Sequence, residues 1–515
     1  MAGAAMTGVT PGAKGGILRL DALLDRAARS RPRREAVVFG DIRRTYAEVH
    51  DRTLRLAGGL RALGVQKGDR VAMWTTNCAE FMEVFFGAAM LGAIASPLDY
   101  WWNWQEAFAA LTQLRPRILI LGAAQAEAAF AARASLGECG IEHVFCLDAP
   151  PSTAAFDSYA DLIARSAPLE EPSQVAPSDP AVILFTSGST GRSKGAVHTH
   201  GSLTATAATM ALELDLRDGE RTLHFLPMFS SCLEHLLPLT LVRATHVILA
   251  RFDAPTIWET ARSCGITHMN AVPTTLRRLL EGAPEEIPPS LALVSYASER
   301  MPRPLIAALV ERMPRVRFVQ FYGMIEHLCL TVMDSQDQVR KSGTVGRLMI
   351  GAQLRVDDAG EIHARSASMF AGYWQDAPAT AQVMHSGFMR TGDLGRFDEE
   401  GFLQLEGRVK EMIKSGGMTV IPAEVEEVLV AHPGVREAAV VGVPDDQWGE
   451  AVHAFAVLAP GACVTQADLK AFTQERLAGY KRPKVIHFVP ELPKTGIGKI
   501  ARRIVREWVL ASATR

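Results

Sequence analysis

The sequence lacks the cysteine pattern of a disulfide framework or of a zinc site. Its seven cysteines are scattered, their number is odd, and no two of them form a C-x-x-C pair. Paired or regularly spaced cysteines are the signature of disulfides and of structural zinc. We therefore predict free thiols in a reducing compartment, which places the protein in the cytoplasm.

Net charge and long hydrophobic runs are also scarce. Lysine and arginine number 54 and aspartate and glutamate 56, so the formal net charge is only −2. No overall field attracts nucleic acid, and any phosphate recognition must be local. The most apolar long stretch, residues 81–98, is interrupted by Glu83 and closed by Pro97. This favours a buried helix and no transmembrane segment.

The chain begins with a segment that carries no structural signal. Residues 1–16 lack an apolar core long enough for a signal peptide, and we predict a flexible tail. Further on, apolar runs at residues 70–74, 118–121 and 144–147 alternate with helical segments. Such alternation predicts βαβ units and a layered α/β fold, and 515 residues exceed one ordinary domain.

The most informative stretch is TSGSTGRSKG at residues 186–195, which follows the apolar run AVILF. A Walker A loop is excluded because Ser193, and not glycine, precedes Lys194. A hydrolase elbow needs a helix after its serine, whereas AVHTH, with the β-branched Val197, suits a strand. We predict a phosphate-binding loop between two antiparallel strands, in which glycines let exposed N–H groups approach an anion. A plain surface loop remains the alternative.

Two side features allow competing interpretations. His198 and His200 have metal-pair spacing, but no third ligand stands near them, so we expect exposed strand residues. Trp101, Trp102 and Trp104 form an aromatic cluster. Packing explains the cluster most simply, and a partner-facing patch is the alternative.

The loop at 186–195 resembles the signature loop of the adenylate-forming superfamily, which contains acyl-CoA synthetases, aryl-CoA ligases, adenylation domains and luciferases. Further matching motifs follow in the family's order, at residues 226–229 (LPMF), 272–274 (VPT), 322–326 (YGMIE), 391–393 (TGD), 407–408 (GR) and 493–499 (PKTGIGK). Together these motifs are specific for the superfamily, although they do not identify the substrate.

The resemblance implies a large N-terminal domain of several subdomains, with layered sheets and helices, over residues 17–407. It implies a hinge at 408–411, centred on Lys410, and a small mobile α+β lid domain at 412–515. It also implies the chemistry: a carboxylic acid attacks ATP in the presence of Mg²⁺, the lid domain turns, and the thiol of coenzyme A attacks the acyl-adenylate. Because no carrier domain is appended and the last three residues are no peroxisomal signal, we predict an acyl-CoA ligase.

The resemblance also assigns roles to individual residues. Lys499, Glu326 and Thr186 are the implied catalytic residues, and Glu326 and Thr186 also hold Mg²⁺. Tyr322 stacks on adenine, and Asp393 accepts from the ribose hydroxyls. The acyl pocket is assigned to Phe229, Ser230 and Ser231. The residues that bind ATP or coenzyme A are Thr186, Ser187, Gly188, Ser189, Thr190, Gly191, Lys194, Ala297, Ser298, Glu299, Tyr322, Gly323, Asp393, Arg408, Lys414, Gly416 and Gly417.

The chain departs from the family pattern on the adenylation side. Ser230 stands where many relatives have a large ring, which weakly favours a bulky cyclic acid. Ala297–Glu299 replace a Gly-Gly-Ala stretch, and Ile325 replaces a threonine whose hydroxyl meets phosphate. One lost hydrogen bond to a charged group costs about 1.5–3 kcal/mol.

These departures leave three alternatives open. The protein could mainly thioesterify an acyl-adenylate supplied by a partner adenylating enzyme. It could instead load an acyl-carrier protein or an amine, or it could be an inactive binding protein. The sequence does not predict the oligomeric state.

Overall fold

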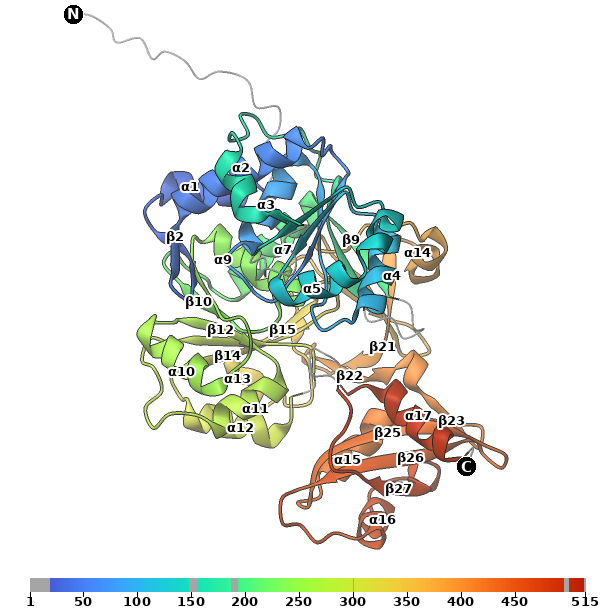
Figure 1. The fold of residues 1–515 in the computed structure, drawn as a ribbon. Coiled ribbons are helices and arrows are strands. Elements are labelled where there is room, and N and C mark those ends of the chain that lie inside the picture. Colours follow the sequence, from blue (N-terminus) through green and yellow to red (C-terminus); the bar gives the residue numbers. More distant parts are fainter. Residues whose placement is uncertain (1–18, 148–155, 187–192, 300, 495–499, 514–515) are drawn as a thin grey trace, which may run out of the picture.

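The computed structural model describes residues 19–147, 156–186, 193–299, 301–494 and 500–513 (Figure 1). Layered sheets and helices form a large N-terminal part, and a small α+β domain follows at the C-terminal end. The predicted fold class is therefore confirmed.

The first sheet carries the strand pair that flanks the predicted phosphate loop. Its order is β19-β9-β8-β4-β3-β5-β6-β7 within the described residues. The strands are β3 (Arg70–Trp74), β4 (Ile94–Pro97), β5 (Ile118–Leu121), β6 (His143–Cys146), β7 (Asp157–Ser158), β8 (Pro180–Thr186), β9 (Lys194–Thr199) and β19 (Gly372–Tyr373). The centre is parallel, whereas β9 runs antiparallel to both β8 and β19.

Helices cover both faces of this sheet, so its central strands are continuous apolar runs. On β3, Val71 faces a core built with α1 (Ala22–Ser30), α2 (Tyr46–Ala62), α3 (Phe81–Leu91) and α7 (His200–Glu213). Trp74 faces the opposite core, built with α4 (Trp104–Leu114) and α5 (Ala123–Ala131).

A second sheet runs in the order β16-β15-β14-β13-β12-β10-β11-β1-β2 over the described residues. Its strands are β1 (Glu35–Phe39), β2 (Ile42–Thr45), β10 (Arg221–His224), β11 (Thr245–Ile248), β12 (His268–Ala271), β13 (Leu293–Tyr296), β14 (Arg317–Tyr322), β15 (Thr331–Met333) and β16 (Arg347–Leu348). One face packs on α10 (Ala254–Ser263), α11 (Pro273–Glu281) and α12 (Arg303–Arg312), as Figure 1 shows.

Shorter helices connect these layers. They are η1 (Arg133–Cys139), α6 (Tyr159–Arg165), α8 (Met228–Ser231), the π-helical turn η3 (Cys232–Leu236), α9 (Leu237–Leu241), α13 (Ser335–Gln338) and α14 (Ala377–Val383).

The third sheet leads into the small domain. It contains β17 (Gln353–Val356), β18 (Glu361–Arg365), β20 (Met384–His385), β21 (Phe388–Phe397) and β22 (Leu403–Arg408). The helical turn η4 (Val409–Glu411) follows β22 at the predicted hinge. The small domain lies beyond it, below β22 in Figure 1.

The small domain is a sheet covered on both faces. Its strands are β23 (Ile413–Ser415), β24 (Met418–Val420), β25 (Val435–Asp445), β26 (Gly449–Leu458) and β27 (Val485–Phe488). The helices α15 (Pro422–Val430) and α16 (Gln466–Gln474) cover one face, and α17 (Arg502–Ala513) covers the other. A short turn, η5 (Gly479–Lys481), precedes β27.

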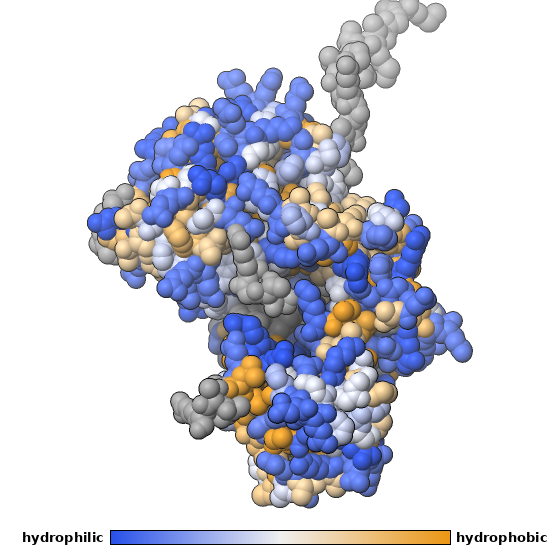
Figure 2. Space-filling view, turned by 90° about the vertical axis from the view of Figure 1, so that its right-hand side faces the viewer, coloured by the Kyte–Doolittle hydropathy of each residue, from blue (hydrophilic) through white to orange (hydrophobic). Residues whose placement is uncertain are grey.

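The surface agrees with the balanced composition. Figure 2 shows hydrophilic residues over most of the displayed face and apolar residues in small patches. Among the helices of the described residues, none combines the length and the apolar character that a membrane crossing requires.

Of two expectations from the sequence, the buried helix within residues 81–98 is confirmed only over Phe81–Leu91, and the exposure of His198 and His200 is wrong. Residues 81–98 form helix α3 and then strand β4, because Gly92 adopts a left-handed conformation (φ 66°) that ends the helix. His198 and His200 are fully buried and not exposed. The His198 ring is covered by Ile325 and by Ser202 of α7, and His200 begins α7, which packs into the core.

Candidate active site

The strands β8 and β9 hold the two ends of the predicted phosphate loop together. They pair antiparallel, as predicted, and their register places Thr186 opposite Lys194. The ammonium of Lys194 lies 4.9 Å from the ring centre of Tyr373, on the neighbouring strand β19. Five predicted nucleotide-binding residues, Ser187, Gly188, Ser189, Thr190 and Gly191, lie outside the described residues.

A tight turn after β14 carries two more predicted site residues, Tyr322 and Glu326. A Cβ atom on Gly323 would lie 1.8 Å from the carbonyl oxygen of Leu328, so only glycine fits there. The Leu328 N–H also donates to the carbonyl of Met324 at 2.6 Å, which closes the turn. The turn brings the Glu326 carboxylate within reach of Tyr373, whose hydroxyl donates to Oε1 at 2.7 Å.

At the other end of the turn, Tyr322 joins Asp393 and Arg408. The Tyr322 hydroxyl donates to one oxygen of Asp393 at 2.8 Å, and Nε of Arg408 lies 2.9 Å from the other. Burial and the nearby Asp393 charge raise the pKa of Tyr322, while Asp393 raises the pKa of Arg408. Each carboxylate oxygen has a second lone pair, so Asp393 can still accept from a ribose hydroxyl.

The segment Ala297–Glu299 follows β13 and differs from the glycines of the resembled family. Ser298 adopts a positive φ of 77°, which glycine reaches without strain and serine rarely adopts. The Glu299 carboxylate accepts from the backbone N–H of Thr274 at 3.3 Å and from its hydroxyl at 2.8 Å. The glutamate thus bonds to the first turn of α11.

His198 is a site residue that sequence reasoning missed. Its Nε2 lies 2.7 Å from the carbonyl oxygen of Ile325, which can only accept, so the imidazole donates this hydrogen bond. Burial lowers the pKa of His198 to about 4, so the ring is neutral at pH 7. Because Ile325 also packs against the core, His198 fixes the backbone beside Glu326. The only signal in the sequence was the position of His198 on a strand next to the loop.

The predicted acyl-pocket residues lie beside an aromatic cluster from another segment. The ring of Phe229 meets Tyr100 at 5.6 Å and Trp101 at 5.9 Å, both nearly edge-on. Trp101 is 48% exposed, and burial raises the pKa of Tyr100 to about 12. The Ser230 hydroxyl donates to the Pro227 carbonyl at 3.2 Å, and the side chain of Ser231 lies outside the described residues.

The predicted residues of the small domain lie apart from these clusters. Gly416 and Gly417, with φ of 59° and 77°, form the turn between β23 and β24. On the same hairpin, Lys414 donates to the Thr419 hydroxyl at 2.7 Å. Arg502 of α17 pairs with Glu411, beside the exposed hinge residue Lys410, at 3.3 Å.

Lys499, the predicted catalytic lysine, lies outside the described residues.

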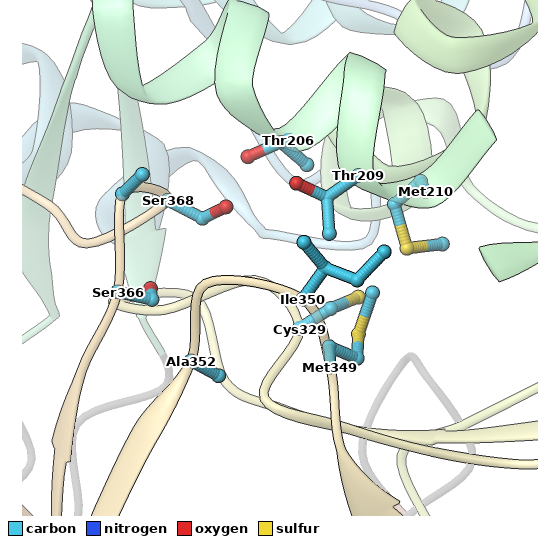
Figure 3. Close-up of a pocket in the computed structure, with 10 residues that line it drawn as sticks. Thr206, Thr209, Met210, Cys329, Met349, Ile350, Ala352, Ser366 and Ser368 are labelled. Atoms are coloured by element: carbon cyan, nitrogen blue, oxygen red, sulfur yellow. The ribbon is translucent and has the colours of Figure 1, made fainter. Parts of the chain in front are cut away.

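Two other features were considered as sites. A cavity of about 10 Å³, enough for about one water molecule, lies between α7 and the turns at 349–352 and 366–368 (Figure 3). No predicted site residue lines it. Asp357, Glu361 and His363 have ligand atoms within 4.8 Å of one another. Arg390, however, pairs with Glu361, so a cation there would compete with a guanidinium.

Comparison with known families agrees with this geometry. Residues 24–374 match the model of the AMP-binding enzyme family, and residues 424–499 match the model of the AMP-binding enzyme C-terminal domain. The chain belongs to the AMP-binding enzyme family. The first match contains Thr186, Lys194, Tyr322, Glu326 and Tyr373, and the second reaches Lys499.

The relatives of this enzyme are named for different carboxylic acids. The long-chain-fatty-acid–CoA ligase FadD13 of Mycobacterium tuberculosis is 34% identical, over 96% of this chain and 99% of the relative. A feruloyl-CoA synthase of an Amycolatopsis species is 33% identical, over 93% and 97%. The structure of the anthranilate CoA ligase AuaEII in complex with anthranoyl-AMP has a TM-score of 0.86 at 28% identity, over 96% and 98%.

Proposed function

We propose that the enzyme joins a bulky, ring-bearing carboxylic acid to coenzyme A through an acyl-adenylate. The chain is an ATP-dependent acid–CoA ligase of the AMP-forming type, as its family and its curated relatives indicate. The identity of the acid, the roles of individual residues and the use of Mg²⁺ are the proposed part.

The observation that carries the residue roles is the turn from Tyr322 to Glu326. It joins the Tyr322–Asp393–Arg408 cluster, where we place the nucleoside, to Glu326 beside Tyr373 and Lys194, where we place the phosphates. Two polar clusters at the two ends of one turn, each with a tyrosine, a carboxylate and a cation, suit a ligand with a sugar at one end and a polyphosphate at the other.

The donor set near the phosphates suits Mg²⁺. Glu326 offers carboxylate oxygens and Thr186 a hydroxyl, and hard divalent cations prefer such oxygen ligands. Of the two carboxylate oxygens of Glu326, only Oε1 accepts a hydrogen bond from the described residues, and its donor is Tyr373. A bound Mg²⁺ would neutralise charge on the phosphates.

The proposed chemistry proceeds in two displacements at one site. A carboxylate oxygen of the acid attacks the α-phosphorus of ATP, and the bond to pyrophosphate breaks. Lys194 would contact the phosphates, and Lys499 would offset the charge that develops on phosphorus. The small domain then turns about Lys410, and the coenzyme A thiolate attacks the acyl carbon and releases AMP. Gly416 and Gly417 would line the thiol path.

The substrate class rests on the aromatic residues around Phe229. The rings of Phe229, Tyr100 and Trp101 offer edges and faces that pack well against a planar or cyclic acyl group. The small side chain of Ser230 leaves space beside them. A long linear chain would gain less from these specific ring contacts.

A panel of carboxylic acids, scored by the mass of the acyl-CoA formed, tests this substrate class. We expect aromatic and fused-ring acids to have a higher kcat/KM than linear acids of equal carbon number. Trp101→Ala should lower kcat/KM for ring-bearing acids about tenfold and leave that for linear acids nearly unchanged. Trp508→Ala, a partly exposed tryptophan of the small domain, is the control. Equal effects of Trp101→Ala on both acid classes would contradict the proposal.

A second candidate function is supported by Ile325, which offers no hydrogen bond next to Glu326. In this second function, the enzyme adenylates slowly and mainly transfers the acyl group of an acyl-adenylate made by a partner enzyme to the thiol of coenzyme A, with release of AMP. Single-turnover assays of acid plus ATP and of acyl-adenylate plus coenzyme A separate the two functions. Comparable rates in both half-reactions would exclude the second candidate. A screen of coenzyme A, an acyl-carrier protein and amines as acceptors tests the alternative that the enzyme loads a carrier protein or an amine.

A further inference from the structure

The backbone of Tyr373 is fixed beside the start of β9. In the antiparallel pair of β19 and β9, Tyr373 lies opposite Ala196. Its N–H donates to the Thr380 hydroxyl at 2.9 Å, and the next residue, Trp374, donates to the Gly195 carbonyl at 2.7 Å. The position of the Tyr373 ring is therefore set by the same strand that carries Lys194.

The side chain of Tyr373 contacts two charged groups. Its hydroxyl donates to Glu326 at 2.7 Å, and its ring carries the Lys194 ammonium 4.9 Å from the ring centre. Phe370, whose ring centre is 5.0 Å away, packs against it and also donates its N–H to the Glu326 carbonyl at 2.8 Å. Segment 370–373 thus holds Glu326 through both its backbone and its side chain.

The chemistry of a phenol allows both contacts without cancelling either charge. A tyrosine phenol is protonated near neutral pH, so the Tyr373 hydroxyl donates its hydrogen to the Glu326 carboxylate. A neutral donor orients a carboxylate and leaves its negative charge intact. The face of the ring attracts an ammonium through its quadrupole and also leaves that charge intact.

The placement of Tyr373 has a second consequence. A lysine and a glutamate this near to one aromatic ring could otherwise approach and form a direct ion pair. Such a pair would take the ammonium from the phosphates and the carboxylate from a metal ion. Among the ion pairs of the described residues, none joins Lys194 to Glu326. Tyr373 instead contacts each group separately, Lys194 through its ring and Glu326 through its hydroxyl.

We propose that Tyr373 is a positioning residue that orients Glu326 toward a nucleotide-bound divalent cation and keeps it apart from Lys194. This inference rests on the proposed function, since Glu326 and Lys194 act on the metal and the phosphates there. Tyr373 itself touches neither the acid nor the reacting phosphorus in this scheme.

Two substitutions separate the two contacts of Tyr373. Tyr373→Phe removes the hydroxyl and keeps the ring beneath Lys194, whereas Tyr373→Leu removes both. Tyr480→Phe, which removes a hydroxyl in the small domain, is the matched control. Binding of Mn²⁺ to each protein in the presence of a non-hydrolysable ATP analogue is measured by electron paramagnetic resonance, and the affinity for the analogue is measured by calorimetry.

We expect Tyr373→Phe to raise the Kd for Mn²⁺ about tenfold, which is the loss of one hydrogen bond to a charged group. The affinity for the analogue without metal should change little. Tyr373→Leu should also weaken binding of the ATP analogue in the absence of metal, because Lys194 can then pair with Glu326. In a Glu326→Gln background, Tyr373→Phe should have no further effect on Mn²⁺ binding. Tyr373→Phe should convert acyl-adenylate and coenzyme A to acyl-CoA at the rate of the unmodified enzyme.

The outcomes distinguish failure of this inference from failure of the proposed function. If the unmodified enzyme binds neither the analogue nor Mn²⁺, the proposed function fails. If it binds both, and Tyr373→Phe matches Tyr480→Phe in Mn²⁺ affinity, the inference about Tyr373 is wrong. If Tyr373→Leu does not fold, Tyr373→Phe decides alone, because it keeps the ring and its packing against Phe370.

Discussion

Replacing Ile325 with threonine should accelerate the adenylation half-reaction. The backbone at this position is held on both sides, because His198 donates to the Ile325 carbonyl at 2.7 Å and Phe370 donates to the Glu326 carbonyl at 2.8 Å. A new side chain at residue 325 therefore starts from a fixed Cα position. Its hydroxyl would lie next to Glu326, where the proposed function places the phosphates.

The size of the effect follows from one added hydrogen bond. A hydrogen bond to a charged phosphate contributes about 1.5–3 kcal/mol, which is roughly a ten- to hundredfold change in rate. Because Ile325 packs partly against two core clusters, its shortening should also cost about 1 kcal/mol of stability. Ile325→Val loses similar volume and has nearly the shape of threonine, so the comparison of the two variants isolates the hydroxyl.

The assay is single-turnover release of pyrophosphate with saturating acid and ATP. Ile325→Thr should exceed Ile325→Val by at least about tenfold, while both variants perform the acyl-adenylate plus coenzyme A step at the unmodified rate. Equal pyrophosphate release by the threonine and valine variants would refute the reasoning. It would mean that residue 325 does not face the phosphates or that another group already supplies the contact.

Two further predictions concern the turn and the buried histidines. Gly323→Ala should abolish nucleotide binding and lower the thermal midpoint, because its Cβ would lie 1.8 Å from the Leu328 carbonyl, whereas Gly479→Ala, with open space around it, should do neither. Normal calorimetric binding by Gly323→Ala would contradict the geometry of the turn. Acid should unfold the enzyme between about pH 6.5 and 4, because burial lowers the pKa of several histidines to about 4 in the folded chain, while the unfolded chain takes up protons from about pH 6.5 downward. Each such histidine favours unfolding by up to about 3 kcal/mol at the acid end of this window, so circular dichroism that stays native to pH 4 would show that they are not buried and neutral. The histidines in question are His198, His200, His224 and His327.

Several apolar runs were correctly predicted as strands because the central strands of a parallel sheet are buried on both faces. The runs at 70–74, 118–121 and 181–185 are strands for this reason. Within residues 81–98 the buried helix was predicted correctly over Phe81–Leu91, but the strand after it was missed, because both elements are buried and no change of polarity marks their boundary. The left-handed Gly92 makes that boundary, and a single glycine is a weak signal in a sequence.

The sequence by itself determined the family, the α/β class and the strand–loop–strand unit, because motifs and hydrophobic periodicity are local properties of the chain. Only the tertiary structure decided which side chains meet around Glu326. Residue 373 reaches it because β19 pairs with β9, a strand that lies far from it in the sequence. Contacts with Ile325 and Ser202 likewise bury His198, which a local pattern predicted to be exposed. Contacts between distant strands depend on how the whole sheet is ordered, and no short stretch of sequence carries that order.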